Sequence, residues 1–538
     1  MKQDEIQQVA RTTFGWEHLR PAQLEAIQAA VSGQDVLAVL ATGYGKSAVY
    51  QVAAQLREGI TVVVSPLIAL QEDQIAGLRQ APDAPEAVAL HSAGGARRTK
   101  DAWRRLRSGE AEYVLLAPEQ LAKEDVQQSL AELEVSMLVV DEAHCIASWG
   151  HDFRPDYLLI GAAAERLGRP PIVALTATAS TPVREEIVTR LGLRDPRILL
   201  GDIDRPNIEL AVRRYAEDGE KRAAVLAEVA EAEGTGLLYV ATRRETESYA
   251  EELVARGKRA AAYHGGLPAR ERDRVHREFL DGSLDVVCAT SAFGMGIDKE
   301  DVRFVVHADA PESVDAYYQE MGRAGRDGEP ARATLHYRPE DLALRRYFAT
   351  KRPGRAELSK VVAALGQSET PRTRLVEATG LSARRVTALL TLLVDTATAR
   401  LGRRGARLRG GVDAERAVEQ ALERVEERER IDRSRIEMLR SYAETRRCRR
   451  QVLLGYFGQP LDEPCGNCDT CAAGSAFEEA AAPDRGWQVD ERVDHEEWGP
   501  GTVMEVEDDR MTVFFESAGY KTLALRVVEE NEVLRSAS

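Results

Sequence analysis

The sequence predicts an α/β protein with two tandem lobes, each built on a parallel sheet, followed by a helical basic segment, a helical cysteine-bearing segment and a small β-barrel. A chain of 538 residues with 44% hydrophobic residues exceeds what one core can organise, so several domains are expected. Apolar runs alternate with helical patterns through residue 340, and the alternation restarts near residue 236. Beyond residue 345 the strand pattern stops and helices with basic flanks follow.

Short, continuously apolar runs rich in β-branched residues mark the strands of the lobes. Such runs, when helices separate them, are typical of parallel strands buried on both faces. They lie at residues 36–40, 61–64 and 136–140 in the first lobe and at 236–240, 285–289 and 304–306 in the second. A division near residues 201–206 predicts lobes at 1–205 and 206–345.

A glycine-rich loop follows the first strand and precedes a helical pattern at 48–56. Glycines let backbone N–H groups approach phosphates, and the helix N-terminus adds positive potential. Lys46 would reach the β- and γ-phosphates of ATP, and Ser47 would bind Mg²⁺. Leu40 replaces the first glycine of the general motif, and the segment alone could also be an ordinary glycine turn. The expected nucleotide-binding residues are Thr42, Gly43, Gly45, Lys46 and Ser47.

Asp141 and Glu142 follow the strand at 136–140 and support a nucleotide site. At the carboxyl edge of a parallel sheet, Asp141 would hold Mg²⁺ and Glu142 would orient or deprotonate the attacking water. The alternative for an isolated Asp-Glu pair is an acidic cap on the next helix. A cap explains neither the strand before the pair nor the upstream loop, so a catalytic role is favoured.

The loop after this pair combines base-stacking side chains with a phosphate-pairing arginine. Trp149, Phe153 and Arg154 are therefore candidates for contact with nucleic acid. Their position beside Glu142 indicates that DNA occupancy is coupled to hydrolysis. Packing of the two aromatic side chains between helices is the alternative. Further strand contacts are expected from loops at 65–67, 176–178 and 293–298.

Residues 346–411 have a winged-helix-like pattern. Two helices joined at Gly380, with Ser382 as N-cap, predict a helix-turn-helix, and residues 400–409 predict a hairpin wing. Residues 345–411 contain fifteen Arg or Lys residues and four acidic residues, which gives this segment a net charge of +11, whereas the whole chain has a net charge of −16. This contrast assigns Arg403, Arg404 and Arg407 to duplex or junction DNA, with a solvated helical spacer as the alternative.

Four of the six cysteines lie close together, in the segment at 412–474. Cys448, Cys465, Cys468 and Cys471 can offer four thiolates to one Zn²⁺. Their spacing is also compatible with an iron–sulfur cluster, although the usual fourth cysteine followed by proline is missing. No disulfides are expected. Because no run of about 18 apolar residues and no signal-peptide pattern occurs, we expect a cytoplasmic, nucleoid-associated protein without a membrane partner.

Several motifs in a fixed order make the chain resemble superfamily 2 helicases and, within them, the RecQ family. The resemblance covers residues 14–345 and 430–471, and it implies RecA-like lobes with Asp141 in a DEAH box. It implies an enzyme that hydrolyses ATP to unwind DNA with 3′→5′ polarity in recombination or repair, and it favours zinc at the four cysteines. The motifs lie at 19–23, 64–70, 141–157, 175–179 and 319–328, with the zinc segment at 448–458.

The resemblance also implies roles for residues outside the phosphate loop. Gln23, in one motif with Arg20, would bind the nucleotide by pairing with the adenine edge. Arg323 and Arg326 of the second lobe would reach the γ-phosphate as arginine fingers, so the site is complete only when the lobes close. A solvated basic turn is the alternative for these two arginines.

The order of the modules departs from the family pattern, because common RecQ proteins carry the winged helix after the zinc site and not before it. The expected substrates are single-stranded DNA and duplex or branched DNA. Two other functions stay open from the residues: an ATP-driven translocase that remodels protein–DNA complexes, and a DNA-binding adaptor. The intact nucleotide-site residues argue against the adaptor.

The last segment, 486–538, is expected to be a Tudor- or SH3-like barrel, after a linker at 472–484. Short strands at 489–495, 502–506 and 511–515, with a turn at 498–501, predict it. Residues 495–503 resemble the Tudor-like tails of UvrD-type helicases, which implies RNA polymerase or a repair protein as partner. From residue 485 onward the chain contains six basic and thirteen acidic residues, and this net charge of −7 would repel phosphates. An inert stabilising tail is the alternative.

Overall fold

The structure is a computed structural model that describes residues 3–41, 43–66, 68–91, 95–147, 154–293, 299–342, 353–366, 368–402, 405–480, 486–487, 491–506, 510–515, 517–531 and 533–536. The chain divides into two compact units. The first comprises Met1–Asp341, Leu439–Asp490 and Met504–Asp509, and the second Leu342–Met438, Glu491–Val503 and Arg510–Ser538. Among the described helices, none has the length and apolar composition needed to cross a membrane.

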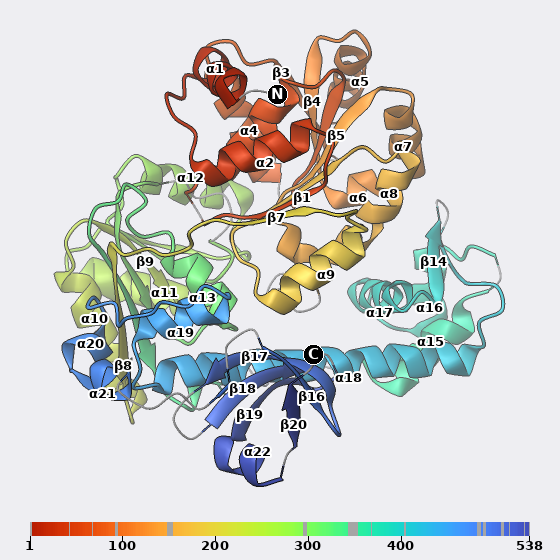
Figure 1. The fold of residues 1–538 in the computed structure, drawn as a ribbon. Coiled ribbons are helices and arrows are strands. Elements are labelled where there is room, and N and C mark those ends of the chain that lie inside the picture. Colours follow the sequence, from red (N-terminus) through yellow and green to blue (C-terminus); the bar gives the residue numbers. More distant parts are fainter. Residues whose placement is uncertain are drawn as a thin grey trace. The chain divides into compact units, whose positions relative to one another are not determined.

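The first lobe is a seven-stranded parallel sheet with helices on both faces (Figure 1). The strand order is β3-β4-β2-β5-β6-β1-β7. Its strands are β1 (Val36–Val39), β2 (Ile60–Val64), β3 (Glu86–Leu90), β4 (Ala111–Leu116), β5 (Val135–Val140), β6 (Ile172–Thr176) and β7 (Arg197–Leu200). Its helices are α1 (Gln3–Phe14), α2 (Pro21–Val31), α3 (Lys46–Ala54), α4 (Ile68–Gln80), α5 (Gly95–Arg107), α6 (Pro118–Leu121), α7 (Glu124–Ala131), α8 (Ile160–Arg166) and α9 (Thr181–Leu191).

The apolar runs of this lobe are continuous because alternate residues serve two separate cores. In β1, Val36 and Ala38 pack into the core that α1 to α4 complete. Their neighbours Leu37 and Val39 pack into the opposite core, to which α5 to α9 contribute. Both faces of the strand are thus removed from water, which is the situation that the uninterrupted apolar pattern predicts.

The second lobe repeats this architecture with six parallel strands in the order β10-β11-β9-β12-β13-β8. The chain leaves the first lobe at the end of β7 and begins the second at Ile208. The strands are β8 (Ile208–Arg214), β9 (Thr235–Tyr239), β10 (Ala260–Tyr263), β11 (Val286–Ala289), β12 (Val302–His307) and β13 (Ala331–Tyr337). The helices are α10 (Asp218–Glu231), α11 (Arg243–Ala255), α12 (Ala269–Leu280) and α13 (Val314–Met321).

The helical segment of the second unit has the predicted helix-turn-helix and hairpin. Gly380 ends α16 in the left-handed conformation (φ 67°), and the Ser382 hydroxyl accepts a hydrogen bond from Arg385 N at 3.2 Å at the start of α17. Ala399 and Ala406 of the hairpin pack into the same core as the helices. The elements are α15 (Arg355–Ala364), α16 (Arg372–Thr379), α17 (Ala383–Asp395), β14 (Ala399–Gly402), β15 (Gly405–Leu408) and the long α18 (Ala414–Glu444).

The cysteine-bearing segment and the tail complete the chain. The segment contains α19 (Arg449–Tyr456), α20 (Asp469–Ala472) and α21 (Ser475–Ala480). The tail forms a five-stranded antiparallel sheet in the order β19-β18-β17-β16-β20, where a small barrel was expected. Its elements are β16 (Arg492–His495), β17 (Gly499–Val506), β18 (Arg510–Phe515), β19 (Gly519–Ala524), α22 (Leu525–Asn531) and β20 (Leu534–Ser536).

One local prediction near the C-terminus gains detail and another is wrong. Part of the linker expected at 472–484 is helical, over Ser475–Ala480, since alanine and glutamate favour a helix wherever nothing opposes it. The turn expected at 498–501 lies earlier, because Gly499 to Gly501 already pair with β16. A Cβ on Gly501 would lie 2.5 Å from the Phe515 ring, so glycine there permits close packing of a strand and does not mark a turn.

Candidate functional site

The phosphate loop connects the carboxyl end of β1 to the first turn of α3. Gly43 and Gly45 adopt the left-handed conformation at φ 80° and 82°, which side chains with a Cβ rarely adopt. Lys46 begins α3, and its Nζ donates to the Leu40 carbonyl oxygen at 3.3 Å. Backbone N–H groups, a lysine ammonium and a helix N-terminus therefore meet, as phosphate binding requires. Thr42 lies outside the described residues.

Gln23 is bonded to the phosphate loop in this structure. Its Nε2 donates to the carbonyl oxygens of Tyr44 at 3.0 Å and Gly45 at 2.9 Å, and its Oε1 accepts from Arg20 N at 2.8 Å. The Arg20 guanidinium lies 4.5 Å from the centre of the Tyr44 ring. Pairing of Gln23 with an adenine edge stays a prediction, and it requires the amide to exchange one of these bonds.

Asp141 ends β5 beside the phosphate loop and is only 7% exposed. Its carboxylate accepts hydrogen bonds from Gln74 Nε2 at 3.1 Å and from the backbone N–H of Glu142 at 3.0 Å. Burial raises the pKa of the Asp141 carboxyl, while the nearby positive charge of Lys46 opposes that rise. The Asp141 carboxylate and the Ser47 hydroxyl supply the oxygen ligands that Mg²⁺ prefers, so these residues fit the ion.

Glu142 adopts a left-handed backbone conformation (φ 49°, ψ 49°), which is rare for a residue with a Cβ and is often found at functional sites. Its Oε2 lies 3.3 Å from His144 Nδ1. His144 Nδ1 in turn lies 2.9 Å from Thr176 Oγ1, which donates to the Thr178 carbonyl oxygen at 2.9 Å. Buried polar groups thus connect the candidate catalytic carboxylate to the loop at 176–178.

A cavity of about 600 Å³ brings together four of the five predicted catalytic residues; Asp141 is not in its lining. Lys46 and Glu142 line it from the first lobe, and Arg323 and Arg326 line it from the second. The phosphate loop and the arginine loop lie close together, because a Cβ on Gly43 would lie 3.6 Å from Arg326 Cγ. The phosphate loop also contributes Gly43, Gly45 and Ser47 to the lining, and α4 contributes Gln74.

Several residues of this cavity escaped the sequence reasoning. Phe14 and Trp16, whose rings stack at 4.7 Å, line it near the phosphate loop, and the Gln74 amide holds Asp141. The two aromatic residues Phe14 and Trp16, which lie just before Arg20 in the sequence, could have indicated a place in the nucleotide site. No sequence pattern identified Gln74, since its role depends on how the fold places α4 next to Asp141.

The loop that carries the two arginines is held by Arg205, a residue of the connector between the lobes. The Arg205 guanidinium donates to the carbonyl oxygens of Gly322 at 2.8 Å, Ala324 at 2.6 Å and Gly325 at 2.8 Å. Asn207 Nδ2 also donates to the Gly325 carbonyl oxygen, at 2.8 Å. The connector therefore fixes the backbone of the arginine loop.

The four predicted cysteine ligands converge on one point. All four sulfur atoms lie within 4.8 Å of one another, and Cys448 Sγ is 4.0 Å from Cys468 Sγ. Tetrahedral Zn²⁺ with bonds of about 2.3 Å holds its sulfurs about 3.8 Å apart, so the cluster fits zinc. Cys145 and Cys288 are buried elsewhere, and none of the six cysteines is in a disulfide.

The cysteine-bearing segment packs on the connector and on β8. Arg450, 4% exposed, donates to the Ile208 carbonyl oxygen at 2.6 Å, and Asn467 Nδ2 donates to the Pro206 carbonyl oxygen at 2.9 Å. Asp469 Oδ2 accepts from Val212 N at 2.9 Å. Since β8 is the last strand of its sheet, these bonds cover an edge that would otherwise be open.

The candidate DNA-binding residues are only partly described. Trp149, Phe153, Arg403 and Arg404 lie outside the described residues. Arg154 Nη1 donates to the Pro66 carbonyl oxygen at 2.9 Å, which joins the aromatic loop to the loop at 65–67. In the hairpin, the exposed Arg407 pairs directly across from the exposed Arg400. Two like charges in one cross-strand pair repel each other, and an anion would relieve that repulsion.

The sequence matches four family models. Residues 20–187 match the DEAD/DEAH box helicase family, and residues 220–328 match the helicase conserved C-terminal domain. Residues 411–472 match the RecQ zinc-binding family, and residues 489–532 match a protein family of unknown function. These matches cover both lobes, the cysteine-bearing segment and the tail.

Similar proteins are described as DNA helicases. The chain is 33% identical over 469 residues to a probable ATP-dependent DNA helicase RecS of Bacillus subtilis, covering 87% of this chain and 91% of the relative. It is 34% identical over 502 residues to ATP-dependent DNA helicase RecQ of Synechocystis, covering 87% and 98%. To RecQ of Haemophilus influenzae it is 35% identical over 464 residues, covering 86% of this chain and 63% of that relative's length.

Two solved structures share the fold at low sequence identity. The DUF1998 helicase MrfA bound to DNA has a TM-score of 0.53 and 17% identity, with coverage of 77% of this chain and 63% of that chain. The Mycobacterium smegmatis helicase Lhr, bound to single-stranded DNA and AMP-PNP, has a TM-score of 0.50 and 20% identity, with coverage of 90% and 67%.

Proposed function

We propose, from the premise that the chain belongs to the RecQ family of superfamily 2 helicases, that it uses ATP hydrolysis to move along single-stranded DNA and to unwind duplex or branched DNA. The observation that carries this proposal is the cavity in which Lys46 and Glu142 of one lobe face Arg323 and Arg326 of the other. A site split between two lobes makes ATP a bridge between them, and its hydrolysis releases that bridge.

Each residue then has a chemical role. Lys46 and the loop N–H groups bind the phosphates, and Glu142 takes a proton from the attacking water or orients it. Arg323 and Arg326 stabilise negative charge that develops on the γ-phosphate. Mg²⁺, held by Ser47 and Asp141 when bound, would neutralise phosphate charge.

The contacts behind Glu142 give a route from DNA to hydrolysis. Glu142 connects through His144 to Thr176 and so to the loop at 176–178, which we assign to strand contact. A shift of this loop on DNA binding would move His144 and reorient the Glu142 carboxylate. Because hydrolysis needs the carboxylate within hydrogen-bond reach of water, a small reorientation changes the rate strongly.

Strand displacement on duplexes with a 3′ or a 5′ overhang tests the proposed function. We expect ATP-dependent displacement with the 3′ overhang, the polarity implied by the family, together with ATPase stimulated more by DNA than by RNA. Displacement of the strand only on the duplex with the 5′ overhang would show the opposite polarity. DNA-stimulated ATPase without displacement on either duplex would show that the protein is a translocase and not a helicase.

The aromatic loop should couple DNA to hydrolysis. Replacing Trp149 and Phe153 with Ala should leave ATP affinity intact and lower DNA-stimulated hydrolysis about tenfold or more, because two base-stacking surfaces worth about 1–3 kcal/mol each are removed. Steady-state ATPase with and without single-stranded DNA measures this. Leu159→Ala, at an exposed leucine beyond the loop, is a control for the cost of losing surface area. Unchanged stimulation in the double variant would show that the aromatics only pack.

We propose that the basic hairpin of the second unit binds duplex or junction DNA. Replacing Arg403, Arg404 and Arg407 with Ala should weaken duplex binding and reduce the salt dependence of log K by about one unit for each phosphate that is no longer bound. Equilibrium binding at several salt concentrations measures the slope. Replacing Arg385 with Ala is the control, because that arginine already forms an ion pair with Glu357. Equal slopes for wild type and the triple variant would refute the assignment.

We propose that the acidic tail binds a protein, with RNA polymerase or a repair protein as the family-implied choice. Deleting residues 480–538 should leave DNA-stimulated ATPase and unwinding within about twofold of the full chain, since acidic residues do not bind phosphates. Pull-downs with the full chain and the truncated chain, probed for RNA polymerase, measure the loss of the partner. Loss of DNA binding on truncation would contradict this proposal.

We assign one function to each segment. Residues 1–205 bind ATP, and residues 206–345 supply the arginine loop that completes the ATP site. Residues 346–411 bind duplex DNA, residues 412–474 bind zinc, and residues 486–538 bind the protein partner. Because the proposed substrate is DNA, we place the protein at the nucleoid.

A further inference from the structure

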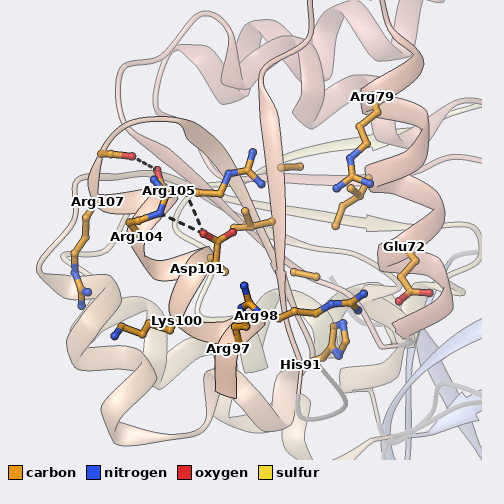
Figure 2. Close-up of a pocket in the computed structure, with 16 residues that line it drawn as sticks. Glu72, Arg79, His91, Arg97, Arg98, Lys100, Asp101, Arg104, Arg105 and Arg107 are labelled. Atoms are coloured by element: carbon orange, nitrogen blue, oxygen red, sulfur yellow. Dashed lines mark hydrogen bonds and ion pairs between the residues drawn. The ribbon is translucent and has the colours of Figure 1, made fainter. Parts of the chain in front are cut away.

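A second large cavity lies on the first lobe, away from the nucleotide site. It has a volume of about 1450 Å³, and α4, β3 and α5 form its walls. Figure 2 shows basic side chains of α5 and Arg79 of α4 gathered around it. Seven Arg or Lys residues and two acids, Glu72 and Asp101, line this cavity, which we call the α5 cavity. The seven bases are Arg79, Arg97, Arg98, Lys100, Arg104, Arg105 and Arg107.

Most of this positive charge is not neutralised by the protein. Arg104 forms ion pairs with Asp101 and Glu110, and Arg105 pairs with Glu86 at 2.7 Å. In the part of the chain that the structure describes, the five remaining bases have no carboxylate within ion-pair distance. These five are Arg79, Arg97, Arg98, Lys100 and Arg107. In a chain of net charge −16, such a concentration of unpaired cations favours an anionic ligand.

A further polar group in the α5 cavity also lacks a partner. His91 follows β3, and its Nδ1 is buried without a hydrogen bond among the described residues. Buried side-chain nitrogens are nearly always hydrogen-bonded, and an exception calls for a ligand, water or ion. This atom and the unpaired bases therefore indicate the same kind of ligand independently.

The sequence builds α5 so that its charges face outward. Ala102 and Leu106, one turn apart, are 5% and 4% exposed and anchor the helix to the core of the lobe. The remaining positions between Arg97 and Arg107 are mostly basic. Over ten residues the helix rises about 15 Å, which corresponds to about four phosphates along one DNA strand. The spacing matches a polyanion and not a single phosphate.

The α5 cavity lies at the same edge of the first-lobe sheet as the nucleotide site. β3 is the outermost strand, and His91 stands at its carboxyl end, the edge that also carries Asp141 after β5. Helix α4 stands between the two cavities: Asp73 and Gln74 line the nucleotide cavity, whereas Glu72 and Arg79 line the α5 cavity. Helix α4 follows the loop at 65–67 and lines the α5 cavity, so one element joins the loop that we assign to strand contact to the α5 cavity.

We propose that the α5 cavity binds the phosphodiester backbone of DNA outside the cleft between the lobes. This inference rests on the proposed function, because it takes DNA as the substrate. Flexible Arg and Lys side chains supply the binding groups, and contacts to phosphates carry no direct sequence information, so binding should be independent of sequence. The site lengthens the DNA footprint of the first lobe.

The triple variant Arg97→Ala, Arg98→Ala, Lys100→Ala tests the proposal through the salt dependence of DNA affinity. Removing three phosphate-binding side chains should reduce the slope of log K against log salt by about two to three units, and it should raise the Kd at about 0.1 M salt about tenfold or more. Fluorescence anisotropy on a single strand and on a blunt duplex measures this. The thermal midpoint should stay within about 2 °C of wild type, because these side chains support no core.

The matched control removes the same charge elsewhere. Arg194, Arg197 and Arg256 are exposed and lie at the opposite, amino-terminal edges of the two sheets. Their triple Ala variant changes the net charge equally and should keep the wild-type slope. An equal loss of slope in both variants would mean that net charge alone acts, and it would overturn the site.

Crosslinking locates the DNA directly. Ser108 lines the α5 cavity, whereas the exposed Ser283 lies in the second lobe. A photoreactive group attached to S108C should crosslink DNA, and the same group on S283C should not. Crosslinking of an added RNA in preference to DNA at S108C would also overturn the proposal. Failure of the wild-type chain to bind any DNA would overturn the proposed function as well, whereas wild-type unwinding with an unchanged slope in the α5 variant would overturn the α5 cavity alone.

Discussion

Replacing Arg326 with Ala should lower kcat for ATP hydrolysis by about 10³-fold or more, with ATP affinity changed only a few-fold. Arg326 lines the nucleotide cavity from the second lobe, and its side chain lies close to Gly43 of the phosphate loop. Stabilisation of charge that develops only in the transition state affects kcat much more than binding. The same result is expected for Arg323, which is 7% exposed and lines the same cavity.

Three measurements separate this role from a structural one. Fluorescent-nucleotide binding gives the ATP affinity, steady-state ATPase gives kcat, and the thermal midpoint reports folding. Arg326→Lys should recover little, because lysine keeps the charge and loses the planar fork of donors. Arg332→Ala is the control in the same lobe, because Arg332 pairs at the surface with Glu209 at 2.9 Å. A near-normal kcat for both Arg323→Ala and Arg326→Ala would contradict the catalytic role and would favour the alternative, in which the two arginines belong to a solvated basic turn.

Replacing Cys468 with Ala should remove the bound metal and unfold the segment around α19 and α20. Structural Zn²⁺ sites contribute about 10–16 kcal/mol of binding energy, which a marginally stable protein does not replace from other contacts. The same segment bonds to the connector through Arg450 and Asn467, so its loss should also disorder the arginine loop and lower ATPase. Metal analysis, thermal unfolding and ATPase together measure the effect.

The control for the cysteine variant is Cys288→Ala, a buried cysteine in β11 far from the cluster in the sequence. It removes one small apolar group and should cost about 1–2 kcal/mol. A chelator should lower the thermal midpoint of wild type and of Cys288→Ala alike, with little effect on Cys468→Ala. One equivalent of zinc retained by Cys468→Ala would exclude Cys468 as a ligand.

Local patterns predicted the parts of the site that local geometry determines. The left-handed glycines of the phosphate loop, the strand before Asp141 and the cap at Ser382 each depend on a few neighbouring residues. The structure has these features within one or two residues of the expected places. The continuous apolar runs predicted both sheets for the same reason, since burial on two faces leaves a mark on every residue of a strand.

Contacts between distant residues left no comparable mark. Arg205 holds a loop more than one hundred residues away, and Gln74 of α4 bonds to Asp141, 67 residues further along the chain. Their importance depends on packing that no short window contains. Arg323 and Arg326 could be placed beside Lys46 only through the family resemblance. The α5 cavity was missed because its basic residues belong to no known motif, and only the fold brings Arg79 of α4 near the six bases of α5.

The cover that the cysteine-bearing segment gives to β8 has a consequence for the synthesis of the protein. A ribosome makes β8 and its neighbour β13 long before it reaches Cys471, so the newly made second lobe has an open strand edge for more than one hundred residues of translation. Open edges pair readily with other chains. Cells short of zinc should therefore accumulate this protein as aggregates during translation. Slower expression with added zinc should raise the yield of the soluble chain.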